Sequence, residues 1–105
     1  MRYTELIEDR QKGKALPDTG YKDAYVVIYR AVLTSVSEFR PMDYVTLRRR
    51  WAIEHAQHVA AMEGEPAHVL RALVRAKYVF EAYNPGEYFY DGPEVTGRPI
   101  YLAEP

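Results

Sequence analysis

Residues 24–33 read AYVVIYRAVL, and this run is the expected centre of the fold. Its apolar residues occupy both alternating positions of an extended chain, a pattern typical of a strand whose two faces are both covered. Arg30 stands near the end of the run. A buried arginine needs a partner, because an unpaired charge is very costly away from water. Arg30 therefore indicates either a salt bridge to a nearby carboxylate or a binding position for a phosphate or a ribose hydroxyl.

Shorter elements are expected on both sides of this strand. Residues 1–12 have the spacing of a short amphipathic helix, and residues 34–39 read as a polar loop. Further strands are expected at residues 43–47, 68–74 with an extension toward Phe80, 87–90 and 98–102. Residues 48–62 have helical spacing, with an apolar stripe of Trp51, Ala52, Ala56, Val59, Ala60 and Met62. Many short strands around one main helix predict a single α+β domain over residues 1–105.

Composition narrows the class of protein. The chain has 105 residues, a net charge of −1 and no cysteine, which excludes disulfides and thiolate metal sites. A net charge this close to zero argues against a dedicated nucleic-acid-binding protein. No apolar run approaches the roughly 20 residues of a membrane span, and no signal-peptide core follows Met1, so a cytoplasmic protein is expected. Ten tyrosines suit stacking on a sugar or a base, and equally the rim of a small core.

The predicted helix carries two groups of chemically interesting side chains. Arg48, Arg49 and Arg50 stand at its start, where positive charges oppose the helix dipole. The run is either a solvated surface or a site for an anion, since the N–H groups of a helix start bind phosphate. His55 and His58 are three residues apart, a spacing that brings two imidazoles within reach of one metal. No third ligand is evident, so no metal is expected and His55 is interpreted as a hydrogen-bonded packing residue.

The stretch NPGEYFYDGP, residues 84–93, places a carboxylate at the start of a short aromatic strand. Turn residues bracket the strand at both ends. Glu87 is therefore either a partly exposed strand carboxylate or a catalytic acid presented at a strand end. Gly86, directly before it, is expected to let a ligand approach the backbone closely.

The order of these pieces resembles the small ADP-ribosyltransferase-like domains of bacterial and phage proteins. The matching pieces are Ile28-Tyr29-Arg30-Ala31, Asp43-Tyr44-Val45-Thr46-Leu47, Trp51-Ala52 with His55-Ala56, Val74-Arg75-Ala76, and Glu87-Tyr88-Phe89-Tyr90-Asp91. The resemblance covers about residues 24–92. It implies a small split β core of mixed or antiparallel strands, with one main helix, a short N-terminal helix, and NAD bound in a cleft between two small sheets.

The resemblance also implies roles for individual residues, taken from the arginine–serine–glutamate branch of the family. Arg30 would hold a phosphate or the nicotinamide ribose, and Thr46 would support the ribose and the glutamate. Glu87 would bind the 2′-hydroxyl of the nicotinamide ribose and stabilise the oxocarbenium-like transition state. Tyr78 or Tyr83 would stack on the nicotinamide.

Three positions depart from the family pattern. Arg48 replaces the usual serine and is expected near the cleft mouth, in contact with NAD; Met42 replaces a glycine. Pro85 stands where many protein-modifying members carry a glutamate or glutamine that orients the target side chain. No metal cofactor is implied.

The expected function is that of an NAD-dependent ADP-ribosyltransferase from a phage, prophage or toxin-like setting. Such an enzyme would cleave the nicotinamide glycosidic bond and transfer ADP-ribose to an acceptor, a protein or another molecule, that the sequence does not identify. The alternative is a catalytically inactive module that binds a protein partner or a nucleotide, as Pro85 and the tyrosine-rich C-terminal segment suggest. A third interpretation is an unrelated small α+β interaction or regulatory protein.

Overall fold

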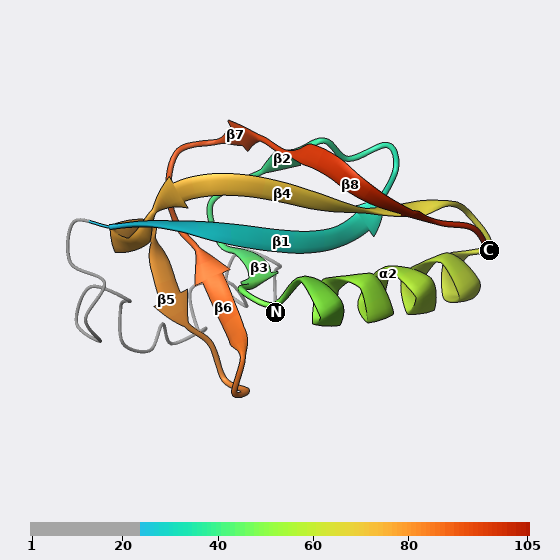
Figure 1. Cartoon of the computed structure of the whole chain (residues 1–105), viewed down its shortest axis with the longest axis horizontal. Helices are drawn as coiled ribbons and strands as arrows, with labels where there is room; N and C mark the ends of the chain where they lie inside the picture. Colours follow the sequence, from blue (N-terminus) through green and yellow to red (C-terminus); the bar gives the residue numbers. More distant parts are fainter. Residues whose placement is uncertain (1–23) are drawn as a thin grey trace, which may run out of the picture.

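The structure is a computed structural model that describes residues 24–105. The helix expected over residues 1–12 lies outside the described residues. Within residues 24–105 the chain is a small mixed α and β domain, in which antiparallel strands surround one α-helix (Figure 1). The elements, in chain order, are β1 (Tyr25–Leu33), β2 (Glu38–Phe39), β3 (Asp43–Thr46), α2 (Arg49–Glu63), β4 (Ala67–Arg75), the 3₁₀ turn η2 (Ala76–Tyr78), β5 (Val79–Glu81), β6 (Glu87–Tyr90), β7 (Val95–Thr96) and β8 (Arg98–Ala103).

The strands of the described region form a six-stranded sheet in the order β5-β6-β3-β1-β4-β8 and a two-stranded sheet of β2 and β7. Every strand pair in this region is antiparallel, so the mixed pairing that was one expectation does not occur there. The strand expected to extend from residue 68 toward Phe80 ends at Arg75. The chain then turns through η2, and β5 pairs with β6 instead.

The six-stranded sheet has a narrow joint at its middle. β1 and β4 pair along nine residues, from Tyr25 opposite Arg75 to Leu33 opposite Ala67. β1 and β3, in contrast, are in register at one pair, Tyr29 opposite Thr46. The sheet therefore consists of one half made of β1, β4 and β8 and a second half made of β3, β6 and β5, which diverge from this joint.

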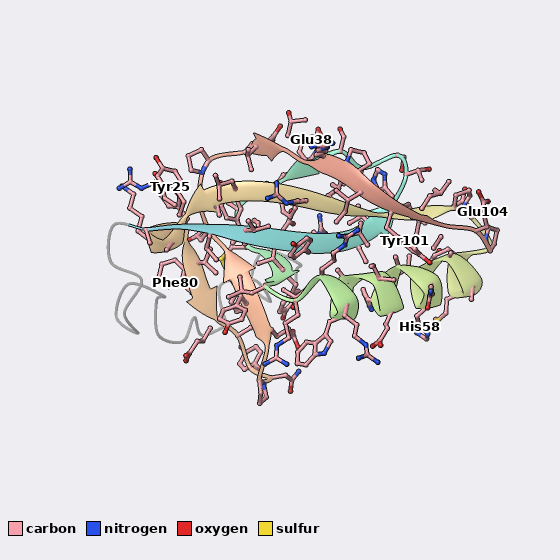
Figure 2. All side chains as sticks on the ribbon, viewed as in Figure 1. Tyr25, Glu38, His58, Phe80, Tyr101 and Glu104 are labelled. Atoms are coloured by element: carbon pink, nitrogen blue, oxygen red, sulfur yellow. The ribbon has the colours of Figure 1, made fainter. Side chains whose placement is uncertain are left out.

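Small side chains let α2 lie close to one face of the first half. Ala52, Ala56 and Ala60 are buried one turn apart, and they pack with Ala67 and Val69 of β4. On the same helix, the Gln57 side chain donates a hydrogen bond of 3.0 Å to the Tyr101 hydroxyl of β8. Figure 2 shows Tyr101 reaching toward the helix.

The predicted apolar stripe of the helix is wrong at its two ends. Trp51 is 40% exposed and Met62 is 70% exposed. Both residues lie off the line of the three buried alanines, because successive helix positions are rotated by about 100°. The helix ends at Gly64, which has φ +68° and donates its N–H to Ala60 O at 2.9 Å.

The opposite face of the sheet carries the larger side chains of the core. Ile28 and Leu70 are fully buried there with Phe39, whose ring meets Tyr90 edge-on at 6.4 Å between centroids. Residues 34–39 were expected to be a loop, yet they contain β2, which brings Phe39 into this core. The Tyr90 hydroxyl donates to the Pro93 carbonyl, and burial, together with the nearby Tyr78, raises the pKa of Tyr90 above its ordinary value. Within residues 24–105, no helix is long and apolar enough to cross a membrane.

Candidate functional site

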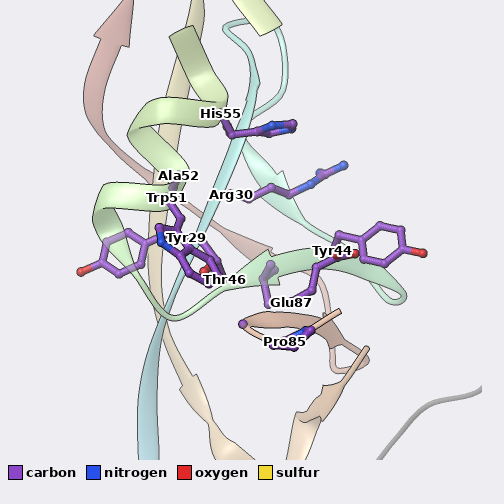
Figure 3. A pocket seen from close by; sticks show the side chains of 12 residues that line it. Tyr29, Arg30, Tyr44, Thr46, Trp51, Ala52, His55, Pro85 and Glu87 are labelled. Carbon is purple, nitrogen blue, oxygen red and sulfur yellow. The ribbon is translucent and has the colours of Figure 1, made fainter. Parts of the chain in front are cut away.

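An open pocket of about 560 Å³ lies at the joint of the sheet, beside the first turns of α2 (Figure 3). Three walls come from β1, β3 and the helix, and the fourth comes from the turn between β5 and β6 (residues 82–86). The lining residues are Tyr29, Arg30, Ala31, Tyr44, Val45, Thr46, Trp51, Ala52, His55, Pro85, Gly86 and Glu87. The pocket implied by the family resemblance lay between two separate sheets; this one instead lies between two halves of the same sheet.

The pocket contains all three residues that sequence reasoning assigned to catalysis. Thr46 is opposite Tyr29 on one side and opposite Glu87 on the other, so the three residues form a row across β1, β3 and β6. Residues directly opposite each other in an antiparallel pair point to the same face, with Cβ atoms about 5 Å apart. The Glu87 and Thr46 side chains therefore lie side by side, and Arg30 lines the same pocket.

Glu87 is oriented by the turn that precedes it. The Asn84 amide donates a hydrogen bond of 2.8 Å from Nδ2 to Glu87 Oε2, and the Glu87 N–H donates to the Asn84 carbonyl at 3.0 Å. These two bonds close the turn around Pro85 and Gly86. A half-buried carboxylate is thereby held at the start of β6, facing the pocket.

Arg30 forms the salt bridge that one interpretation of the sequence predicted. Its Nη1 lies 3.0 Å from Asp43 Oδ2, and the same oxygen accepts the Arg40 N–H at 2.8 Å. An arginine has five N–H donors, so a bond from one nitrogen to Asp43 leaves others to bind a ligand. Figure 3 shows the Arg30 side chain extending from β1 into the space between His55 and Tyr44.

Thr46 links the pocket to the start of the helix. Its Oγ1 accepts the backbone N–H of Arg48 at 3.1 Å, which satisfies one of the amide groups that a helix start leaves without a partner. The hydroxyl group retains its own proton for a further hydrogen bond. Thr46 is therefore both a structural residue of the β3–α2 connection and a polar group in the pocket.

The arginine run at the helix start is an exposed surface. The Arg48 guanidinium lies over the Trp51 ring, 4.7 Å from its centroid, and Arg50 pairs with Glu54 at 3.3 Å. Arg48 does not itself line the pocket. It is nevertheless close to the pocket mouth, because Trp51 does line it.

Gly86 makes a close approach, although to an aromatic ring of the protein and not to a ligand. A Cβ atom added at Gly86 would lie 1.9 Å from Cζ3 of Trp51. Gly86 also has φ +82°, a conformation that favours glycine. The indole of Trp51 thus packs directly against the turn that precedes Glu87.

The aromatic residues of the pocket differ from those that were expected. Tyr78 meets Tyr90 edge-on at 6.3 Å and packs against the core. Tyr83 is 59% exposed, and it lines a second, neighbouring hollow of about 420 Å³. The pocket itself is lined by Tyr29, Tyr44 and Trp51. Sequence reasoning did not select them, although the position of Tyr29 next to Arg30 and of Tyr44 close to Thr46 was an available signal.

His55 is an exposed residue of the pocket wall and not the packing residue that was expected. Its ring is stacked against that of His58, with centroids 6.4 Å apart. Within the described part of the chain, no three histidine, cysteine, aspartate or glutamate side chains are grouped so that they could hold a metal ion.

Comparisons of the chain with models of protein families, with curated proteins and with solved structures found no match. The chemistry of the site is therefore inferred from its own residues.

Proposed function

We propose that the chain is an ADP-ribosyltransferase-like enzyme that cleaves the nicotinamide glycosidic bond of NAD and transfers ADP-ribose to an acceptor. The observation that carries this proposal is the joint presence of Arg30, Thr46 and Glu87 in one pocket. These residues come from three different strands and are far apart in the sequence. The order of motifs expected for such an enzyme selects the same three positions.

The distribution of charge in the pocket suits NAD as a ligand. Glu87 supplies a carboxylate at the end formed by the β5–β6 turn, and Arg30 supplies a guanidinium beside α2 and β3. NAD has the matching polarity, because its diphosphate is anionic and its nicotinamide ribose becomes cationic during bond cleavage. Arginine forks bind phosphate well. The diphosphate would bind toward Arg30, and the reacting ribose would lie toward Glu87.

The bond that breaks joins C1′ of the ribose to the ring nitrogen of nicotinamide. The electron pair leaves with nicotinamide, which departs as a neutral molecule, and positive charge develops on the sugar. A fixed carboxylate stabilises such a charge electrostatically, and it needs no reorganisation during the reaction. The acceptor then forms a bond to C1′ and loses a proton. Binding the diphosphate and the ribose together holds the reacting atoms in position.

A second candidate function is a catalytically inactive module that binds NAD, another nucleotide or a protein. The observation that favours it is that all three groups already have partners within the chain, Glu87 through the Asn84 amide. Arg30 is paired with Asp43, and the Thr46 hydroxyl accepts the Arg48 N–H. The three groups would then have a structural role, and the pocket would bind a ligand without turnover.

Release of nicotinamide distinguishes the two functions. We expect the wild-type protein, incubated with NAD and followed for hours by chromatography, to release nicotinamide. Glu87→Gln should reduce the rate by about 100-fold or more, because it removes the charge that stabilises the transition state while keeping the shape. Glu81→Gln is a matched control, since Glu81 is an exposed residue of β5 outside the main pocket. Equal rates for wild type and Glu87→Gln would refute the catalytic assignment, and NAD binding without release would favour the inactive module.

A further inference from the structure

His55 is placed to act on a ligand in the pocket, although the proposed reaction does not use it. It lies on α2 between Ala52 and Ala56, which are buried against the sheet. Because these two alanines fix the rotation of the helix, the position of His55 at the pocket wall is also fixed. Figure 3 shows the His55 ring and the Arg30 side chain extending from neighbouring walls toward the same side of the pocket.

An imidazole and a guanidinium that reach one ligand from two elements would bind an anion from two sides. Arg30 carries its charge at every physiological pH, whereas histidine side chains gain a proton between pH 8 and pH 5. A protonated imidazole has two N–H donors, and bonds from charged donors to phosphate are roughly twice as strong as neutral ones. The strength of such a site would therefore depend on pH.

We propose that His55 and Arg30 together bind the diphosphate of a dinucleotide ligand, and that protonation of His55 strengthens this binding. The inference rests on the proposed function, since it assigns the diphosphate of NAD to one end of the same pocket. It adds a binding residue from the helix and a pH dependence that the motif residues alone do not supply.

The charges around His55 allow it to act in this way. Arg30, whose own partner is Asp43, lines the same pocket from β1, and Tyr29 and Tyr44 line it from β1 and β3. Glu87 lines the pocket from β6. On the helix itself, the neighbouring Glu54 is paired with Arg50, and His58 stacks on His55 without lining the pocket. The two nearby carboxylates, Asp43 and Glu54, are each paired with an arginine and not with His55. An anionic ligand would therefore be the partner of a protonated His55.

The test measures the dissociation constant of ADP-ribose for the full chain by calorimetry at pH 6 and at pH 8. ADP-ribose contains the same diphosphate diester as NAD, which does not change charge over this range, and it has no nicotinamide to lose. For wild type we expect binding about fivefold tighter at pH 6 than at pH 8. His55→Gln should remove this difference. His58→Gln is the matched control, because His58 is exposed on the outer side of the same helix, and it should keep the difference.

His55→Lys keeps a positive charge at both pH values, so it should bind ADP-ribose about as tightly at pH 8 as wild type does at pH 6. A wild-type affinity that does not change with pH, or an unchanged pH dependence in His55→Gln, would overturn the inference and leave the proposed function intact if NAD is still cleaved. ADP-ribose binding with a pH dependence that requires His55, together with absence of NAD cleavage, would support the inference and refute the enzyme. Absence of ADP-ribose binding by wild type would overturn the inference directly.

Discussion

At the scale of single residues, the site depends on pairs that join distant parts of the chain. Arg30 and Asp43 fix a guanidinium beside the pocket, and Asn84 orients Glu87. Arg30 and Glu87 could be selected from their positions, because each is a charged residue in or at the end of an apolar strand, whereas Thr46 was selected through the family resemblance alone. Sequence reasoning could not foresee the contact between Trp51 and Gly86, since nothing local in either segment specifies the other. The glycine at 86 indicated a close approach, and the structure identifies the approaching group.

The contact of Trp51 with Gly86 leads to a prediction on stability. Gly86→Ala should lower the free energy of unfolding by about 2–4 kcal/mol, because the new Cβ is strained at positive φ and displaces the indole. Gly64→Ala is the matched control. Gly64 also has positive φ, but nothing lies within 4 Å of its added Cβ, so about 1 kcal/mol is expected. Urea denaturation measures both values.

A double variant separates strain from crowding at Gly86. In a Trp51→Ala background the indole is gone, so Gly86→Ala should cost only about as much as Gly64→Ala. Equal costs of Gly86→Ala with and without Trp51 would show that the indole does not constrain the turn that carries Glu87.

At the scale of elements, the sequence predicted β1, β3, β6, β8 and α2 to within one residue at each end, whereas β4 was predicted to extend toward Phe80 and ends at Arg75. β1, β3, β6, β8 and α2 all have enough residues for an alternating or helical pattern to be visible. β2 and β7 have two residues each and β5 has three, too few for any period, so they were missed or merged with a neighbour. The position of such a short strand depends on the core residues that it packs against. β2, for example, carries the fully buried Phe39.

The close packing of α2 gives a prediction at the element scale. Ala56 is fully buried between the helix and the sheet, and Ala61 is exposed on the same helix. Ala56→Leu should destabilise the protein by about 1–3 kcal/mol, because the larger side chain forces the helix away from the sheet. Ala61→Leu should change stability by no more than about 0.5 kcal/mol. Thermal or urea unfolding followed by circular dichroism tests both, and equal small effects would contradict the close packing.

At the scale of the whole molecule, the pocket arises from the way the sheet divides. The two halves meet at the pair Tyr29 and Thr46, and the buried alanines of α2 pack on the half made of β1, β4 and β8, so the space beside the joint stays open. The α+β class followed from the sequence. The single-pair joint did not, because register across strands far apart in the chain depends on packing. The same joint brings Arg30 and Glu87, which are 57 positions apart, into one pocket.

The most direct test of this assignment is an NMR titration of the isotopically labelled full chain with NAD, at concentrations up to the millimolar range. The backbone amide signals of the pocket residues are expected to shift together and to saturate with one dissociation constant; these are residues 29–31, 44–46, 51, 52, 55, 86 and 87. The single tryptophan, Trp51, provides an independent signal through its indole N–H. Shifts confined to another surface, or no shifts at all, would contradict the claim that this pocket binds NAD.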